Sequence, residues 1–207
     1  MFYDYRHARR TLDGPIGQRI LAQFPKYGLQ ALAWNENGFR HITNNLRAIT
    51  YPDDVGKLRI RTMENVVHMA SMRALAAVRP RRWRFRSCSR RCRTASLTRR
   101  RILLPAILAA KFSQTQKYLS LTQHFYSAGI FVISPKVWSG LSRADQEAFV
   151  AAAVVGAKAQ RDRINADEFI ALSELGKQGM KITRILICRH FAVSCDRSIL
   201  PYCRVLT

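Results

Sequence analysis

The chain has 207 residues, 48% of them hydrophobic, and a formal net charge of +22. This length suffices for one large domain or two small ones, with enough apolar material for a core. No run of about 18 apolar residues occurs, so no transmembrane helix is predicted, and the N-terminus lacks the apolar stretch of a secretory signal.

The positive charge is concentrated in two segments. Residues 77–104 hold 11 arginines and no acid, and residues 184–207 hold four arginines and one aspartate, whereas the remaining 155 residues have a net charge of +8. The same two segments contain all five cysteines, Cys88, Cys92, Cys188, Cys195 and Cys203. A main body without cysteine suits an exported bacterial protein.

Apolar periodicity predicts helices that alternate with strands along most of the chain. The predicted helices cover 3–12 (or a loop there), 15–27, 64–76, 105–116 and 143–175, with a capping box at Ser142–Asp145 before the last. The predicted strands cover 29–34, 39–43, 58–63, 117–122, 129–134 and 180–183, with turns at 35–38 and between 122 and 129. This alternation favours an α/β fold with a mostly parallel sheet.

The arginine-rich segment 77–104 follows neither the helical nor the strand period. Its charge density and few apolar residues predict disorder, because such a segment cannot bury enough apolar surface to offset the entropy of ordering.

Several blocks resemble the solute-binding proteins of TRAP transporters, of the organic-acid (dicarboxylate) type. They are LDGPIGQRIL, LQALAWNENGFRHITNN, RAITYPDDVGKLRIRTMEN, ILAAKFSQTQKYLSLTQHFYS, LSRADQEAF and GMKIT. Their order and spacing along the chain match the family. The resemblance implies a two-lobed, periplasmic-binding-protein-like α/β fold, incomplete here, whose lobes are joined by crossing strands and a long helix.

The resemblance also implies a domain organisation and a function. Residues 1–37 correspond to a remnant of the first lobe, 38–125 to the second lobe, 126–183 to a return to the first lobe with the long connecting helix, and 184–207 to a non-native tail. Proteins of this family bind a small organic acid between the lobes and deliver it to TRAP membrane permease subunits. They act in the periplasm, need no cofactor and perform no chemistry.

The resemblance implies a ligand-binding role for Arg61 and a supporting role for Arg40. A guanidinium presents a planar fork of donors that matches a carboxylate with two parallel hydrogen bonds. Taken without the resemblance, both arginines are ordinary exposed strand residues. Glu64 and Asn65 follow the Arg61 strand and are expected to line the cleft, although Asn65 fits equally well as a helix N-cap.

The segment 77–104 departs from the family, which carries there a stretch with an Glu-Asn-Pro motif whose asparagine contacts the ligand. A shifted reading frame explains the difference. If Arg100–Leu103 are encoded CGG AGA ATC CTG, reading from the third base gives GAG AAT CCT, which encodes Glu-Asn-Pro. The same shift from Ala77 onward, with permitted codons, gives GQATPMAFPELFTALQNGKLDAPENPAS.

The C-terminal segment behaves in the same way, since residues 184–191 can be read in the shifted frame as NPDLSPFR, which also resembles the family. Both segments are therefore interpreted as out-of-frame translations, and Ile102 occupies the position of the ligand-binding asparagine. The chain is also interpreted as starting late relative to the family. Binding is expected to be impaired in the chain as written.

Two other functions compete with this interpretation. In the arginine-rich segment 79–101, arginines alternate with Trp83 and Phe85, a pattern suited to phosphate contacts and base stacking in a basic nucleic-acid-binding protein. A metal site would use Cys88 and Cys92 together with Cys188, His190 and Cys195, but the Cys88–Cys92 spacing has no matching second pair, so no metal site is predicted. No catalytic constellation or phosphate-binding glycine loop is present in the sequence, so no enzyme is predicted.

Overall fold

The computed structural model describes residues 2–55, 60–62, 65–74, 81–82 and 99–184. Its helices are α1 (Tyr5–Asp13), α2 (Pro15–Leu21), α3 (Val66–Ala74), α5 (Leu104–Ala109), α6 (Pro135–Ser139) and α7 (Arg143–Lys177), with short 3-10 helices η1 (Phe24–Tyr27), η2 (Pro52–Val55) and η4 (Phe112–Gln114). Its strands are β1 (Gln30–Asn44), β2 (Ile60–Thr62), β3 (Arg81–Arg82), β4 (Arg99–Ile102), β5 (Tyr118–Ile133) and β6 (Lys181–Arg184).

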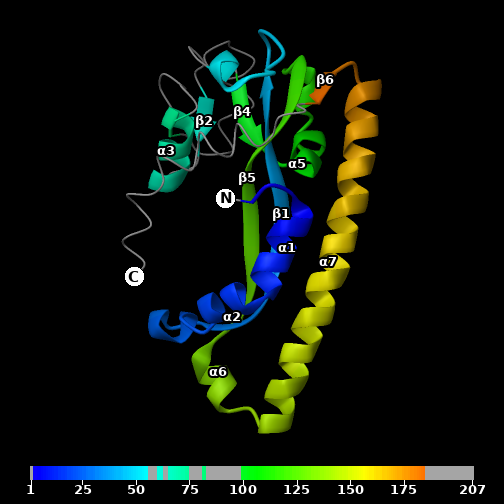
Figure 1. Cartoon of the computed structure of the whole chain (residues 1–207). Coiled ribbons are helices and arrows are strands. Elements are labelled where there is room, and N and C mark those ends of the chain that lie inside the picture. The colour runs from blue at the N-terminus through cyan, green and yellow to red at the C-terminus, as the bar shows by residue number, and fades with distance from the viewer. Residues whose placement is uncertain (1, 56–59, 63–64, 75–80, 83–98, 185–207) are drawn as a thin grey trace. The chain divides into compact units, whose positions relative to one another are not determined.

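The strands form one sheet in the order β3-β2-β4-β1-β5-β6, and β4, β1 and β5 lie side by side in Figure 1. Strand β2 pairs in parallel with β3 and β4, and β5 pairs in parallel with β6, whereas β1 and β4 are antiparallel. The predicted α/β class is confirmed, with a mixed sheet.

The described chain divides into two compact units. The N-terminal unit consists of residues 2–38 and 126–167, and the central unit consists of the described parts of 39–125 and 168–184. The long elements β1, β5 and α7 contribute residues to both units. The end of α7, from Glu168 onward, belongs to the central unit. The sequence-based prediction assigned all of 126–183 to the first lobe.

Two predicted turns, at 35–38 and between 122 and 129, are wrong, because the structure has single long strands there. The polar run at 35–38 resembles a turn, but Glu36 is completely buried within β1. Single residues adopt the left-handed backbone conformation inside the strands instead, with φ of 96° at Gly38 and 45° at Gln123. Glycine tolerates this conformation and Gln123 is strained in it.

A hydrogen-bonded cluster around Glu36 lies inside the N-terminal unit. The Arg9 guanidinium bonds both carboxylate oxygens of Glu36, with 3.1 Å from Nε to Oε2. The hydroxyl of Tyr126 donates to Oε2 at 2.6 Å, and the Glu36 amide donates to Gln160 Oε1 at 3.1 Å. Burial together with the Glu36 hydrogen bond raises the pKa of Tyr126. This cluster ties α1, β1, β5 and α7 together.

A second ion pair holds α7 against the end of α1. Arg161 bonds both oxygens of Asp13, at 2.6 and 2.8 Å, and its guanidinium also donates to the carbonyl of Trp34 at 3.1 Å. The hydrogen bond to Asp13 raises the pKa of Arg161. The Trp34 indole donates to the carbonyl of Gly17 at 3.1 Å, so its polar atom is satisfied inside the core.

The central unit has its own apolar core, built by α5, η4, β5, the end of α7 and the start of β6. Its buried residues are Leu104, Ile107, Phe112, Leu119, Ala171, Leu175 and Met180. The Asn45 side chain connects two chain segments beside this core. It donates to the carbonyl of Thr115 at 2.6 Å and accepts from the Lys117 amide at 2.9 Å.

The structure differs from the predicted disorder of 77–104 at two places, since residues 81–82 and 99–102 form β3 and β4. Backbone pairing requires no side-chain periodicity, and β4 is bonded on both sides, by β1 and by β2. Helix α5 begins at Leu104 with Pro105 in its first turn. The remainder of the segment lies outside the described residues.

Candidate functional site

The two predicted ligand arginines lie on strands of the central unit that are separated only by β4. Arg40 is a half-buried residue of β1, and Arg61 is the middle residue of β2. The register pairs Arg61 with Arg100, and Arg100 with Thr43 of β1. Arg61 is therefore level with Thr43, three residues along β1 from Arg40.

The position of the expected asparagine falls in the same part of the sheet. Ile102 is the last residue of β4 and pairs with His41, the neighbour of Arg40. The predicted ligand positions Arg40, Arg61 and Ile102 therefore come from three adjacent strands. The sequence supplies an aliphatic residue where an amide is expected, and an isoleucine side chain has no hydrogen-bonding group.

Asn65 has a structural role in the fold. Its side-chain oxygen accepts hydrogen bonds from the amides of Val67, at 2.9 Å, and His68, at 3.1 Å. These bonds satisfy two of the unpaired amides at the start of α3. The cap uses the side-chain oxygen of Asn65 and not its side-chain nitrogen. Glu64 lies outside the described residues.

Two histidines near this part of the sheet were not predicted as site residues. His41 is buried, and burial lowers its pKa to about 3, so the imidazole is neutral at physiological pH. Its Nδ1 atom lies 3.5 Å from the Gln123 amide nitrogen. The ring of His68 lies on Phe125, with 4.2 Å between ring centroids. Nothing in the sequence pattern marks these histidines.

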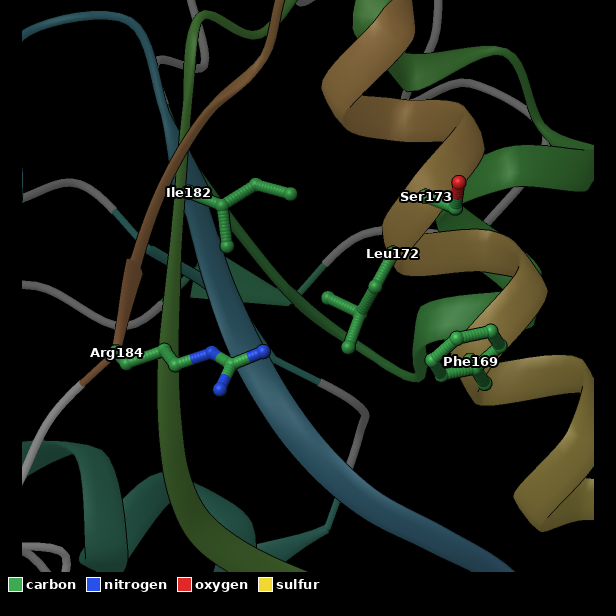
Figure 2. Close-up of a pocket in the computed structure, with 5 residues that line it drawn as sticks. All are labelled: Phe169, Leu172, Ser173, Ile182 and Arg184. Carbon is green, nitrogen blue, oxygen red and sulfur yellow. The ribbon is translucent and has the colours of Figure 1, made fainter.

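A hollow of about 550 Å³ lies elsewhere in the central unit. Figure 2 shows its lining, with Phe169, Leu172 and Ser173 on α7 and Ile182 and Arg184 on β6. Leu172 and Ile182 also pack against the apolar core, so the hollow is the outer edge of that core. Its lining, as far as the described residues go, includes none of the predicted site residues.

The described residues form neither a metal-binding cluster nor a membrane-spanning helix. No group of three or more histidine, cysteine, aspartate or glutamate residues within that part of the chain is arranged to hold a metal ion. No helix there is both long and apolar enough to cross a membrane. The cysteines considered as metal ligands lie outside the described residues.

The comparison with known protein families shows to which family this chain belongs. A family described as bacterial extracellular solute-binding protein, family 7, matches residues 1–186. The chain belongs to this family. The resemblance to TRAP solute-binding proteins is thereby confirmed, and the comparisons give no support to the nucleic-acid alternative.

Individual family 7 relatives agree with this result. A solute-binding protein from Verminephrobacter eiseniae is 40% identical over 182 residues, which are 88% of this chain and 54% of the relative. The 2,3-diketo-L-gulonate-binding periplasmic protein YiaO of Escherichia coli is 31% identical over 192 residues, or 93% of this chain and 58% of YiaO. The chain spans about half the length of the curated relatives it matches.

Solved structures show the same fold. A TRAP periplasmic solute-binding protein from Polaromonas sp., bound to D-erythronate, superposes with a TM-score of 0.87 at 39% identity, covering 98% of this chain and 67% of that protein. A second, from Bordetella with density interpreted as pantoate, gives a TM-score of 0.84 at 36% identity, covering 97% of this chain and 66% of that protein. These similarities confirm the predicted fold family.

Proposed function

We propose that this chain is part of a periplasmic protein that binds a small organic acid and delivers it to a TRAP-type membrane permease. Membership of the family 7 solute-binding proteins carries the proposal. The similar structures named for D-erythronate and pantoate support it, as does the relative named for 2,3-diketo-L-gulonate.

These ligands share a carboxylate, and D-erythronate and pantoate combine it with hydroxyl groups. Relatives named for C4-dicarboxylates, from Rhodobacter capsulatus and Bacillus subtilis, are 26% and 27% identical. The common chemistry is recognition of one carboxylate, with the rest of the ligand varying. We therefore propose a small carboxylic acid as the ligand, with hydroxy acids to be tested beside dicarboxylates.

We assign carboxylate binding to Arg61, with Arg40 in support. The strand order places the two positions on either side of β4, and both lie in the unit that contains Asn65. Buried His41 stays neutral beside Arg40, so it neither repels the cation nor competes for the anion. The Asn65 amide nitrogen and Glu64 are assigned to the edge of the same site.

The out-of-frame interpretation adds a condition to this proposal. Ile102 offers no amide where the family asparagine is expected, so the chain as written is expected to bind more weakly than a version with 77–104 and 184–207 restored to the alternative frame. A hydrogen bond to a charged ligand group contributes about 1.5–3 kcal/mol. Restoring that amide alone is therefore expected to strengthen binding by at least about tenfold.

Calorimetric titration of both versions with D-erythronate, pantoate and succinate tests the proposal, with the uncharged methyl ester of pantoate as control. At least one acid is expected to bind the restored version, and the ester is expected to bind at least about tenfold more weakly than its acid if pantoate is the ligand. Failure of all three acids to bind, or equal binding of acid and ester, would contradict carboxylate recognition.

A further inference from the structure

A second hollow lies within the N-terminal unit, lined by residues of α1, α2, β1 and α7. It has a volume of about 340 Å³, near the lower end of the range of pockets that hold small molecules. Its described lining falls entirely within residues 2–38 and 126–167, so it belongs to one compact unit. The arginines of the candidate carboxylate site, Arg40 and Arg61, belong to the other unit.

Part of this lining is apolar. It comes from Leu32 and Trp34 of β1 and from Val154 and Ala157 of α7. The Trp34 indole already donates to the carbonyl of Gly17, so Trp34 has no donor left for a ligand. Val154 is 56% exposed, so this side of the hollow still has apolar surface to bury. A ligand with an apolar body would gain by covering it.

The rest of the lining is mainly polar. It includes Asp13 of α1, Gln18 of α2, and Lys158 and Arg161 of α7. Two cations and one acid give the described lining a net charge of +1. We call the space between the apolar and the polar lining the Trp34 hollow.

Arg161 keeps one donor without a partner. Its hydrogen bonds to Asp13 and to the Trp34 carbonyl come from the two Nη atoms. Its Nε atom is buried and has no acceptor within the part of the chain that the structure describes. A buried donor without an acceptor lowers stability, and a charged acceptor satisfies a guanidinium donor best. An anion beside Arg161 would therefore be bound favourably.

Lys158 supplies a second cation that is easily redirected. Its side chain is 81% exposed, and its ion pair with Asp162, at 2.9 Å, lies on the surface of α7. Exposed pairs of this kind contribute little to stability, so the ammonium group can turn toward an anion in the hollow at small cost.

We propose that the Trp34 hollow is a binding site for a small monocarboxylic acid with an apolar body. The carboxylate lies beside Lys158 and Arg161, and the body covers Trp34 and Val154. One negative charge matches the net charge of the lining, whereas the second carboxylate of a dicarboxylic acid would lose water against apolar side chains without a partner. The inference concerns a site in the N-terminal unit, so it stands or falls independently of carboxylate binding by Arg61.

Benzoate is the probe for this site, and the amide signals of the isotope-labelled 207-residue chain report its position. Saturable shifts are expected at residues 32–34 and 154–161, with a dissociation constant on the order of 1 mM. Benzamide has the same shape without the charge, and succinate has a second charge without the ring; each is expected to bind there at least about fivefold more weakly. Shifts that do not saturate at these residues, or equal binding of benzoate and either control, would overturn the proposal.

Four variants at exposed positions of α7 separate this site from general attraction of anions to a chain with a net charge of +22. Val154→Phe narrows the hollow and is expected to weaken benzoate binding at least about fivefold, whereas Val155→Phe, outside the described lining, is expected to leave it unchanged. Lys158→Gln is expected to weaken binding about two- to fivefold. Lys177→Gln also removes a lysine paired with an acid on α7, but outside the hollow, and is expected to have no effect. Equal effects of the two valine variants, or of the two lysine variants, would mean that benzoate binds without a defined site.

Discussion

Lowering the pH from 7 to 5 is expected to destabilise the central unit through His41. The imidazole is fully buried in β1, and burial lowers its pKa from 6.5 to about 3. In the unfolded chain the same imidazole takes up a proton below about pH 6.5. Because the unfolded state binds more protons than the folded state between these two pKa values, stability falls as the pH falls through this window.

The size of the effect follows from the two pKa values. Each pKa unit corresponds to about 1.4 kcal/mol, so the unfolded imidazole gains about 2 kcal/mol from protonation at pH 5 and almost nothing at pH 7. The folded imidazole, with its pKa near 3, gains almost nothing at either pH. His41 alone is therefore expected to lower the free energy of unfolding by about 2 kcal/mol between pH 7 and pH 5.

Urea denaturation of the parent chain and of His41→Asn, at pH 7 and pH 5, isolates this contribution. Asparagine cannot titrate and keeps an acceptor near the Nδ1 position that faces the Gln123 amide. The variant is expected to be less stable than its parent at pH 7 but to lose about 2 kcal/mol less on acidification. If parent and variant lose the same stability between the two pH values, His41 is not held neutral by burial. His7→Asn serves as the control for a histidine outside the buried part of the sheet.

Three further predictions test other parts of the structure. Arg9→Met leaves the completely buried Glu36 carboxylate without its guanidinium partner, so urea denaturation is expected to show that the free energy of unfolding falls by about 3–5 kcal/mol. Adding Glu36→Gln to the same chain is expected to restore part of this loss. Purely additive effects of the two substitutions would contradict the pairing of Arg9 with Glu36. Gly17→Ala would place a Cβ atom 1.7 Å from the Leu12 carbonyl oxygen, so thermal unfolding is expected to show a loss of about 1–3 kcal/mol. Gly140→Ala, with its nearest neighbour at 3.5 Å, is the control, and an equal loss in both variants would refute the steric explanation. Sequencing the coding DNA from the codon of Arg73 to that of Ala106, and across Thr183, is expected to reveal a missing or extra base; an unchanged reading would mean that the basic segments are encoded as written.

Elements with strong local signals could be predicted from the sequence. The capping box is present, since the Ser142 hydroxyl accepts a hydrogen bond from the Asp145 amide at 3.2 Å. Helix α7 starts at Arg143, directly after Ser142. The helix ends at Lys177, close to the predicted end, where Gly179 adopts a φ of 84°. Strands β2 and β6 also lie within a residue or two of their predicted bounds. Caps and glycine stops are local devices, so they can be recognised without the tertiary structure.

The long strands could not be predicted in this way. Glu36 has the character of a turn residue, and only its contacts with Arg9 and Tyr126, distant in the sequence, explain why it lies buried in β1. Gln123 lies in a strand despite a positive φ, for which the sequence gives no signal. Helix α6, five residues long, is too short to show a helical period.

The prediction of the candidate site residues rests on the family resemblance alone, and it stays a prediction. Arg40 and Arg61 lie on short or half-buried strand stretches with no local feature that separates them from other basic residues. The Asn65 cap was one of two roles that the sequence allowed, and the structure shows it in the contacts with Val67 and His68. Strand order supplies what the sequence alone does not, since it brings the Arg40, Ile102 and Arg61 positions onto three neighbouring strands.

The measurement that tests carboxylate binding by this chain most directly is a calorimetric titration of the frame-restored version, with its best carboxylate ligand, against Arg61→Ala and Arg61→Lys. Loss of the guanidinium is expected to cost about 2–5 kcal/mol, or at least about thirtyfold in affinity, in Arg61→Ala. Lysine keeps the charge without the two-pronged hydrogen bond, so Arg61→Lys is expected to fall between the parent and Arg61→Ala. Unchanged affinity in Arg61→Ala would remove Arg61 from the site and contradict the proposed mode of carboxylate recognition.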